Sequence, residues 1–178
     1  PGQPGVRRAP APAMDLTRRL ATVRLAGARG RRLGPGGGLA HVRDVACAAL
    51  AAEQVGTARR CLELTVEHTR TRVQFGRPIG SFQALKHRMA DMYVLVETAE
   101  SAAQAAVSAA AEDLPEAAAV AKAYCSEALC SVAAELIQLH GGIAITWEHD
   151  AHLYLKRAHG SAQLFGQPHE HLARLAYN

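Results

Sequence analysis

An arginine and a phenylalanine with the spacing of neighbours on a helix lie in the stretch RVQFGRPIG. Arg72 and Phe75 are three residues apart at the expected exit of a helix, so the guanidinium and the aromatic ring can point to one side. A guanidinium binds pyrophosphate through forked hydrogen bonds, and an aromatic ring packs on adenine. These residues could therefore hold a dinucleotide; the alternative is a simple turn in which Phe75 plugs the space between helices.

A metal site is not expected, although the C-terminal part is rich in histidine. The candidates are His149, His152, His169 and His171. A metal site needs three or four converging ligands, and the sequence contains no HExxH or comparable motif. These histidines are therefore expected at the surface or at helix ends.

The cysteines are expected to be buried thiols. They are Cys47, Cys61, Cys125 and Cys130. They form no CxxC pair and lie in apolar helical stretches, which is typical of a protein in a reducing compartment. Because the sequence shows neither a long uninterrupted apolar run nor a signal peptide, we expect no membrane span and a cytoplasmic location.

Composition favours an all-α fold. The 178 residues fit one domain; 49% are apolar, only 4% are aromatic, and alanine dominates the middle of the chain. This mixture suits helices packed through small side chains better than a β-sandwich. Helices are expected over residues 39–68, 81–112 and 113–140, with a short helix over 150–159 and a last one from Pro168.

Two apolar seams indicate how these helices pack. In the second helix, for which Ser81 is the candidate N-cap, the seam consists of Phe82, Leu85, Met89, Met92 and Val96. In the third helix it consists of Cys125, Leu129, Val132, Leu136 and Leu139. Short connections require antiparallel packing, with the last helix as the fourth member. The prediction is an up-down four-helix bundle over residues 39–178.

The N-terminal part differs from this helical body. Residues 1–13 are rich in proline, alanine and glycine and are expected to form a disordered arm. Residues 14–38 are expected to contain a short strand or hairpin and a linker, with a flexible break at 35–38. Residues 1–34 hold eight arginines against Asp15 alone, which a solvated arm explains; the alternative is contact with nucleic acid.

Two segments resemble a known family. They are TRTRVQFGRPIGSFQALKHRMADMY at 69–93 and QLHGGIAITWEHDAHLYLKR at 138–157. Both resemble the C-terminal helical domain of the FAD-dependent acyl-CoA dehydrogenases of fatty-acid and lipid metabolism, and the resemblance extends over residues 40–176. It implies that residues 14–38 are a remnant of that family's middle β-domain, and that its N-terminal domain and most of its β-domain are absent from this chain.

The resemblance also implies a set of FAD contacts, made to the cofactor of a neighbouring subunit. The implied residues are Arg72, Phe75, Gln83, Gln138, Leu139, His140, Gly141 and Gly142. The glycines would let the backbone approach the cofactor closely. The sequence GGIA has alanine at position 144, where the family more commonly has the glycine of GG-x-G. The resemblance therefore implies that this turn fits the flavin differently from the turn of most members.

The catalytic base of the family has no counterpart at either of its usual positions. Aligned through Gly166, Phe165 stands where the family has a glutamate, and the alternative position on the first helix falls near Ala46. Neither side chain accepts a proton. The resemblance thus implies an acyl-CoA dehydrogenase fragment or subunit without its own base, which on its own would oxidise no acyl-CoA.

Two other interpretations remain open. In one, the chain belongs to an ordinary dehydrogenase whose base is Glu170 or Asp44, with Glu53 a more distant carboxylate. In the other, it is a helical scaffolding or nucleic-acid-binding module that uses its basic arm. The first interpretation, a subunit without a base, implies association with further acyl-CoA dehydrogenase subunits, as a homo- or hetero-oligomer that acts on acyl-CoA, and involves neither nucleic acid nor membrane.

Overall fold

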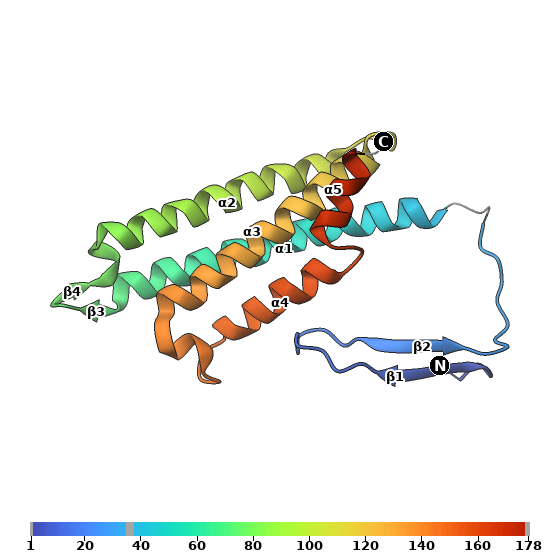
Figure 1. Cartoon of the computed structure of the whole chain (residues 1–178), viewed down its shortest axis with the longest axis horizontal. Helices are drawn as coiled ribbons and strands as arrows, with labels where there is room; N and C mark the ends of the chain where they lie inside the picture. Colours follow the sequence, from blue (N-terminus) through green and yellow to red (C-terminus); the bar gives the residue numbers. More distant parts are fainter. Residues whose placement is uncertain (1, 35–37, 177–178) are drawn as a thin grey trace.

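Three long helices form the body of the protein in the computed structural model, which describes residues 2–34 and 38–176. They are α1 (Gly38–Thr71), α2 (Gln83–Ser108) and α3 (Leu114–His140). The successive helices α1, α2 and α3 alternate in direction, so that α1 and α3 run parallel, and α3 contacts all the other helices (Figure 1). The predicted all-α bundle is therefore confirmed. The second helix ends four residues earlier than expected, because Ala109 is extended.

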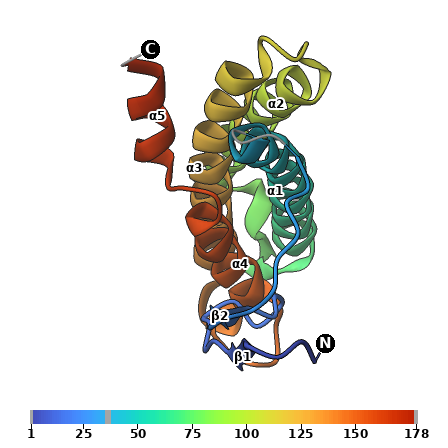
Figure 2. The same cartoon turned by 90° about the vertical axis from the view of Figure 1, so that its right-hand side faces the viewer.

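The fourth position of the bundle is shared by two helices, α4 (Ala151–Gln163) and α5 (Pro168–Ala176). Helix α4 packs along the C-terminal half of α3 and α5 along its N-terminal half, on the side that faces away from α2 (Figures 1 and 2). The last helix, which was predicted to supply the fourth member, does so together with α4. The expected short helix is longer than predicted and carries much of this contact.

The core follows the predicted seam of α3 closely, since all five of its seam residues are buried. In α2, Met92 and Val96 are buried, whereas the first three seam residues, nearer the helix start, are only half-buried. Alanines such as Ala51 and Ala118 have no exposed surface, so the helices approach through small side chains. Three of the four cysteines are buried as expected, and Cys130 is half-buried.

An N-terminal hairpin precedes the bundle. Strand β1 (Val6–Pro10) pairs antiparallel with β2 (Ala21–Leu25), with Val6 opposite Leu25 (Figure 1). The predicted strand is confirmed, but the disordered arm is wrong for residues 6–10, because backbone pairing with β2 orders them. Residue 1 of that arm and residues 35–37 of the predicted flexible break lie outside the described residues.

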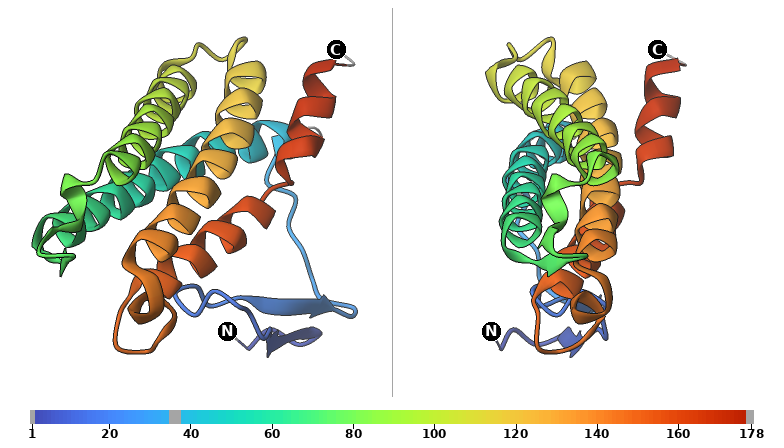
Figure 3. Two further views of the ribbon diagram at one scale, coloured as in Figure 1. Left: turned by 60° about the vertical axis from the view of Figure 1, so that its left-hand side comes forward. Right: turned by 90° about the vertical axis from the view of Figure 1, so that its left-hand side faces the viewer.

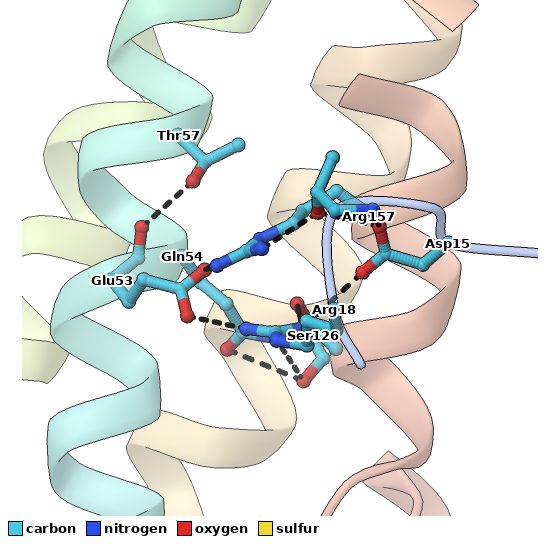
Figure 4. A network of polar contacts seen from close by, with 9 residues as sticks. Asp15, Arg18, Glu53, Gln54, Thr57, Ser126 and Arg157 are labelled. Atoms are coloured by element: carbon cyan, nitrogen blue, oxygen red, sulfur yellow. Dashed lines mark hydrogen bonds and ion pairs between the residues drawn. The ribbon is translucent and has the colours of Figure 1, made fainter. Parts of the chain in front are cut away.

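A polar network joins the segment after β1 to the bundle (Figure 4). Arg18 donates to Ser161 Oγ of α4 at 2.6 Å and forms an ion pair with Glu53 of α1. Glu53 also accepts from Arg157 Nε at 3.1 Å. Asp15 is buried beside them. The basic N-terminal part is therefore not simply a solvated arm, since at least Arg18 is used to attach it.

Helix α3, with the turn after it, is long and apolar enough to cross a membrane, judged by length and composition. The sequence had led us to expect no such segment. Its place at the centre of the bundle, in contact with α1, α2, α4 and α5, explains why it is apolar.

Candidate functional site

The first group of expected cofactor residues, which includes Arg72 and Phe75, lies at a short β-hairpin with a two-residue turn. Helix α1 ends at Thr71, and β3 (Val73–Gln74) then pairs with β4 (Arg77–Pro78). Phe75 and Gly76 form the turn with φ of 54° and 75°. Two successive residues with positive φ are the signature of a type I′ turn. Arg72 and Phe75 therefore do not share a helical face, and the argument from helical spacing is wrong.

Phe75 is presented to solvent in a strained conformation. Its side chain is 91% exposed, although a positive φ is unfavourable for an aromatic residue. Its ring meets Phe82 edge-on at 6.0 Å between centroids, and the Arg77 guanidinium lies 4.0 Å from the Phe82 centroid. Phe75 does not plug the bundle, as the alternative interpretation required. The type I′ turn therefore holds the Phe75 ring away from the bundle.

The hairpin is attached firmly to the end of α1. Ile79 N–H donates to Arg72 O at 2.8 Å, and the short 3₁₀ turn η1 (Ile79–Ser81) follows. A Cβ atom on Gly80 would lie 2.9 Å from Thr69 O, so only glycine allows this close approach. Ser81 is not the N-cap of α2: it donates to Pro78 O within the turn, and Phe82 precedes the helix.

The second group lies where α3 ends in the turn η2 (Gly141–Ile145). Gly141 has φ of 68°, and its N–H donates to Ile137 O, which ends the helix. A Cβ atom on Gly141 or Gly142 would meet nothing within 4 Å, so this backbone is open to a ligand. Gln138 is exposed, but the Leu139 side chain is buried in the core and leaves only its backbone for a cofactor.

A stack of histidines connects the two groups, which lie at the same end of the bundle (Figure 3). His140 is buried and donates from Nδ1 to Leu136 O at 2.8 Å. Its ring stacks on His68 of α1 at 4.2 Å and contacts His149 at 4.7 Å. Burial, and then the neighbouring histidines, lower the pKa values of His68 and His140. We did not anticipate His68, because no local pattern marks it.

The expected position of the base lies in the turn between α4 and α5. Phe165 is 51% exposed and has φ of 60°, and Gly166 follows with φ of 106°. Ala46 on α1 is half-buried. Neither side chain can exchange a proton. Among the described residues, no group of three histidine, cysteine or acidic side chains could hold a metal ion that would replace a base.

The three carboxylates considered as alternative bases are all engaged in contacts within the chain. Asp44 is buried and pairs with Arg174 at 3.0 Å. Glu53 is held by two arginines in the N-terminal polar network. Glu170 Oε2 accepts from the Gln167 N–H at 2.6 Å at the start of α5. Each carboxylate therefore accepts at least one hydrogen bond or pairs with an arginine.

Comparison with known proteins identifies the domain. A family model described as acyl-CoA dehydrogenase, C-terminal domain, matches residues 43–176. The chain belongs to the acyl-CoA dehydrogenase family. Acyl-CoA dehydrogenase IpdE2 of Mycolicibacterium smegmatis is 57% identical over 93% of this chain and 51% of its own length. IpdE2 of Mycobacterium tuberculosis is 58% identical over 93% of this chain and 50% of its own length.

A solved structure agrees with this family assignment. The fold matches the ChsE4-ChsE5 complex from Mycobacterium tuberculosis with a TM-score of 0.92 at 31% identity, over 98% of this chain and 49% of that chain. The chain thus spans about half the length of the relatives it matches. The region matched by the family model begins at residue 43, inside α1, so the N-terminal hairpin lies outside that match.

Proposed function

We propose that this chain is the FAD-contacting and subunit-associating part of an assembly that oxidises acyl-CoA thioesters between their α and β carbons, and that it supplies no catalytic base. The family assignment supports the reaction class. The relatives IpdE2 are named acyl-CoA dehydrogenases, and ChsE4-ChsE5 is named a complex of two components. A hetero-oligomer in which another subunit carries the base is therefore the arrangement we favour.

The two groups at the end of the bundle fit a dinucleotide. The exposed Arg72 guanidinium suits the pyrophosphate, and the exposed Phe75 ring suits the adenine. Gln83 and Gln138 add exposed amides. The open backbone at Gly141 allows a phosphate or ribose to approach. FAD, when bound, would accept the hydride from the substrate β-carbon.

The observation that carries the proposal is that Phe165 and Ala46 stand at the two positions where the resemblance places the base. Phe165 occupies the turn, and the carboxylates of Asp44 and Glu170 are held by Arg174 and by the Gln167 N–H. Loss of a general base typically lowers the rate about 10²–10⁴-fold. The contacts of Asp44 and Glu170 with these partners favour the proposal over the interpretation in which either carboxylate is the base.

The test joins the chain to the half of the Mycolicibacterium smegmatis relative that it does not cover. We expect a yellow holoprotein that reduces no dye with acyl-CoA while Phe165 is present. Phe165→Glu should restore turnover. Phe165→Gln should not, because glutamine has nearly the shape of glutamate but cannot act as a base. Fast turnover with Phe165 in place and no second subunit would refute the proposal.

A further inference from the structure

A lysine is fully buried inside the bundle. Lys122 of α3 has no exposed surface, and its Nζ donates to Ser126 Oγ at 3.0 Å. It also donates to two carbonyls, Ala162 O at 3.1 Å and Gly166 O at 3.0 Å. The Ser126 hydroxyl directs its own proton at Lys122 O, at 2.6 Å. An ammonium has three N–H donors, so these three contacts are all made only by the charged form of Lys122.

The burial of this cation is costly and indicates a purpose beyond filling the core. Lysine is almost never fully buried, and an apolar side chain would occupy the same volume without loss of hydration. Burial accordingly lowers the Lys122 pKa from its ordinary value of 10.5. The two carbonyls show what the ammonium does. Ala162 lies in the last turn of α4 and Gly166 in the turn after it, so Lys122 holds the chain on both sides of Phe165.

The turn that carries Phe165 depends on such side-chain contacts. Among the residues that the structure describes, neither Phe165 nor Gly166 forms a backbone–backbone hydrogen bond. Their carbonyls instead face buried side chains: Gly166 O accepts from Lys122, and Phe165 O lies 3.1 Å from Nε2 of His171. Phe165 has a φ of 60°, a strained conformation that persists only while the surrounding structure imposes it. Side chains of α3 and α5 therefore determine the backbone conformation at position 165.

The contacts that hold this turn do not depend on the phenylalanine side chain. Lys122 and His171 both bind backbone carbonyls, whereas the Phe165 side chain is 51% exposed. The backbone is also packed closely, because a Cβ atom on Gly166 would lie 3.0 Å from His171 Nε2. Another side chain at position 165 should therefore be presented in the same direction as Phe165.

We propose that Lys122 is a positioning residue: its ammonium fixes the backbone at position 165 and thereby the direction in which the side chain at this position projects. The proposal rests on the proposed function in one respect, since the resemblance places the catalytic base of the family at position 165. In this chain Lys122 holds Phe165 there. In Phe165→Glu it would hold a carboxylate at the same place.

The first test uses fluorine NMR on the full chain labelled with fluorophenylalanine. The sequence contains three phenylalanines, so Phe75 and Phe82 are internal references, and Phe165→Leu assigns the third signal. Lys122→Ala should shift or broaden the Phe165 signal alone. The matched control Leu136→Ala opens a cavity nearer the C-terminal end of the same helix and should leave the Phe165 signal unchanged. An unchanged Phe165 signal in Lys122→Ala would overturn the proposal.

Chemical rescue separates the ammonium from the volume that it fills. Propylammonium has the three carbons and the ammonium that Lys122→Ala removes, so refolding the variant in its presence should return the Phe165 signal to its original position. Propanol has a similar size but a single donor, and it cannot bind the Ala162 and Gly166 carbonyls together. Equal rescue by propanol would show that packing alone fixes the turn, and the proposal would be wrong.

A measurement on the unaltered chain decides the matter if Lys122→Ala does not fold. The sequence contains three lysines, so nitrogen-labelled lysine gives three side-chain signals, assigned by Lys86→Arg and Lys156→Arg. The ammonium protons of Lys122 should exchange slowly with water, because they are buried and bound to three acceptors. Exchange as fast as that of the exposed Lys86 would contradict the proposal.

The reaction gives a further readout in the fused holoprotein that carries Phe165→Glu. Adding Lys122→Met, which keeps the volume but removes the donors, should lower kcat about 10–100-fold, as expected for a misplaced base. KM and the flavin content should change little. An unchanged kcat would overturn the role of Lys122. If Phe165→Glu alone gives no turnover, the proposed function fails, whereas the NMR measurements without FAD still decide whether Lys122 positions residue 165.

Discussion

Replacing Phe75 by asparagine should make the protein more stable while weakening its contact with a dinucleotide. Phe75 and Gly76 form a type I′ turn, for which Asn-Gly is the preferred pair. A non-glycine residue in the left-handed region costs roughly 1–2 kcal/mol, and asparagine adopts it much more readily. The substitution therefore removes backbone strain at this position.

The loss of the ring offsets only part of this gain. The ring is 91% exposed, so almost no apolar burial is lost. Its edge contact with Phe82 belongs to a class worth about 0.5–1.5 kcal/mol, and strong exposure places it at the lower end. The net expectation is a gain of about 0.5–1 kcal/mol in the free energy of unfolding, or about 1–4 °C in Tm for a chain of this size.

Urea denaturation followed by circular dichroism measures this difference. Phe75→Leu is the matched control, because leucine removes the ring but keeps the strained backbone, and it should not stabilise the protein. Destabilisation by Phe75→Asn of about 1 kcal/mol or more would show that the ring is packed and that the strain is not relieved. The reasoning from the type I′ turn would then be wrong.

Three further predictions concern the core and the buried polar groups. Leu136→Ala should lower the free energy of unfolding by about 3–5 kcal/mol in urea titrations, since Leu136 is fully buried among packed helices. Lys122→Met should lower the free energy of unfolding by about 1–3 kcal/mol, because the Ala162 and Gly166 carbonyls lose their hydrogen-bond donor. The control Lys86→Met, on the exposed face of α2, should change the free energy of unfolding by less than about 0.5 kcal/mol. Burial lowers the pKa values of His68 and His140, so the urea midpoint should fall as the pH drops below about 6.5, and substituting either histidine by glutamine should weaken this dependence.

The sequence predicted those parts of the fold that depend on local patterns. The seam of α3 was evident because apolar residues recur from Cys125 to Leu139 at the spacing of one helix face, and all are buried. The end of α3 followed from Gly141, whose positive φ terminates the helix. Strand β1 was missed, because VRRAP has no alternation and acquires its structure only by pairing with a strand that begins eleven residues after it ends.

The candidate site was predictable as a set of residues but not as an arrangement. Arg72, Phe75 and the glycines were identified from the motifs that carry the family resemblance. The hairpin that presents Phe75 depends on backbone torsions that the motif does not specify. The Lys122 contact with Ala162 joins residues 40 positions apart. No pattern in a single sequence indicates such a pair, because it arises only when α3 and α4 pack together.

The polar network of Arg18 has a consequence for the order in which the chain folds during synthesis. Arg18 and its partner Ser161 are 143 positions apart, so the contact of the N-terminal segment with α4 cannot form until α4 has been made, although the ion pair with Glu53 of α1 can form earlier. At a ribosomal rate of about 5–20 residues per second, the synthesis of these 143 residues takes roughly seven to thirty seconds. Throughout it the hairpin, which exposes apolar side chains such as Leu25, lacks its contact with α4 and is accessible to chaperones and to other nascent chains.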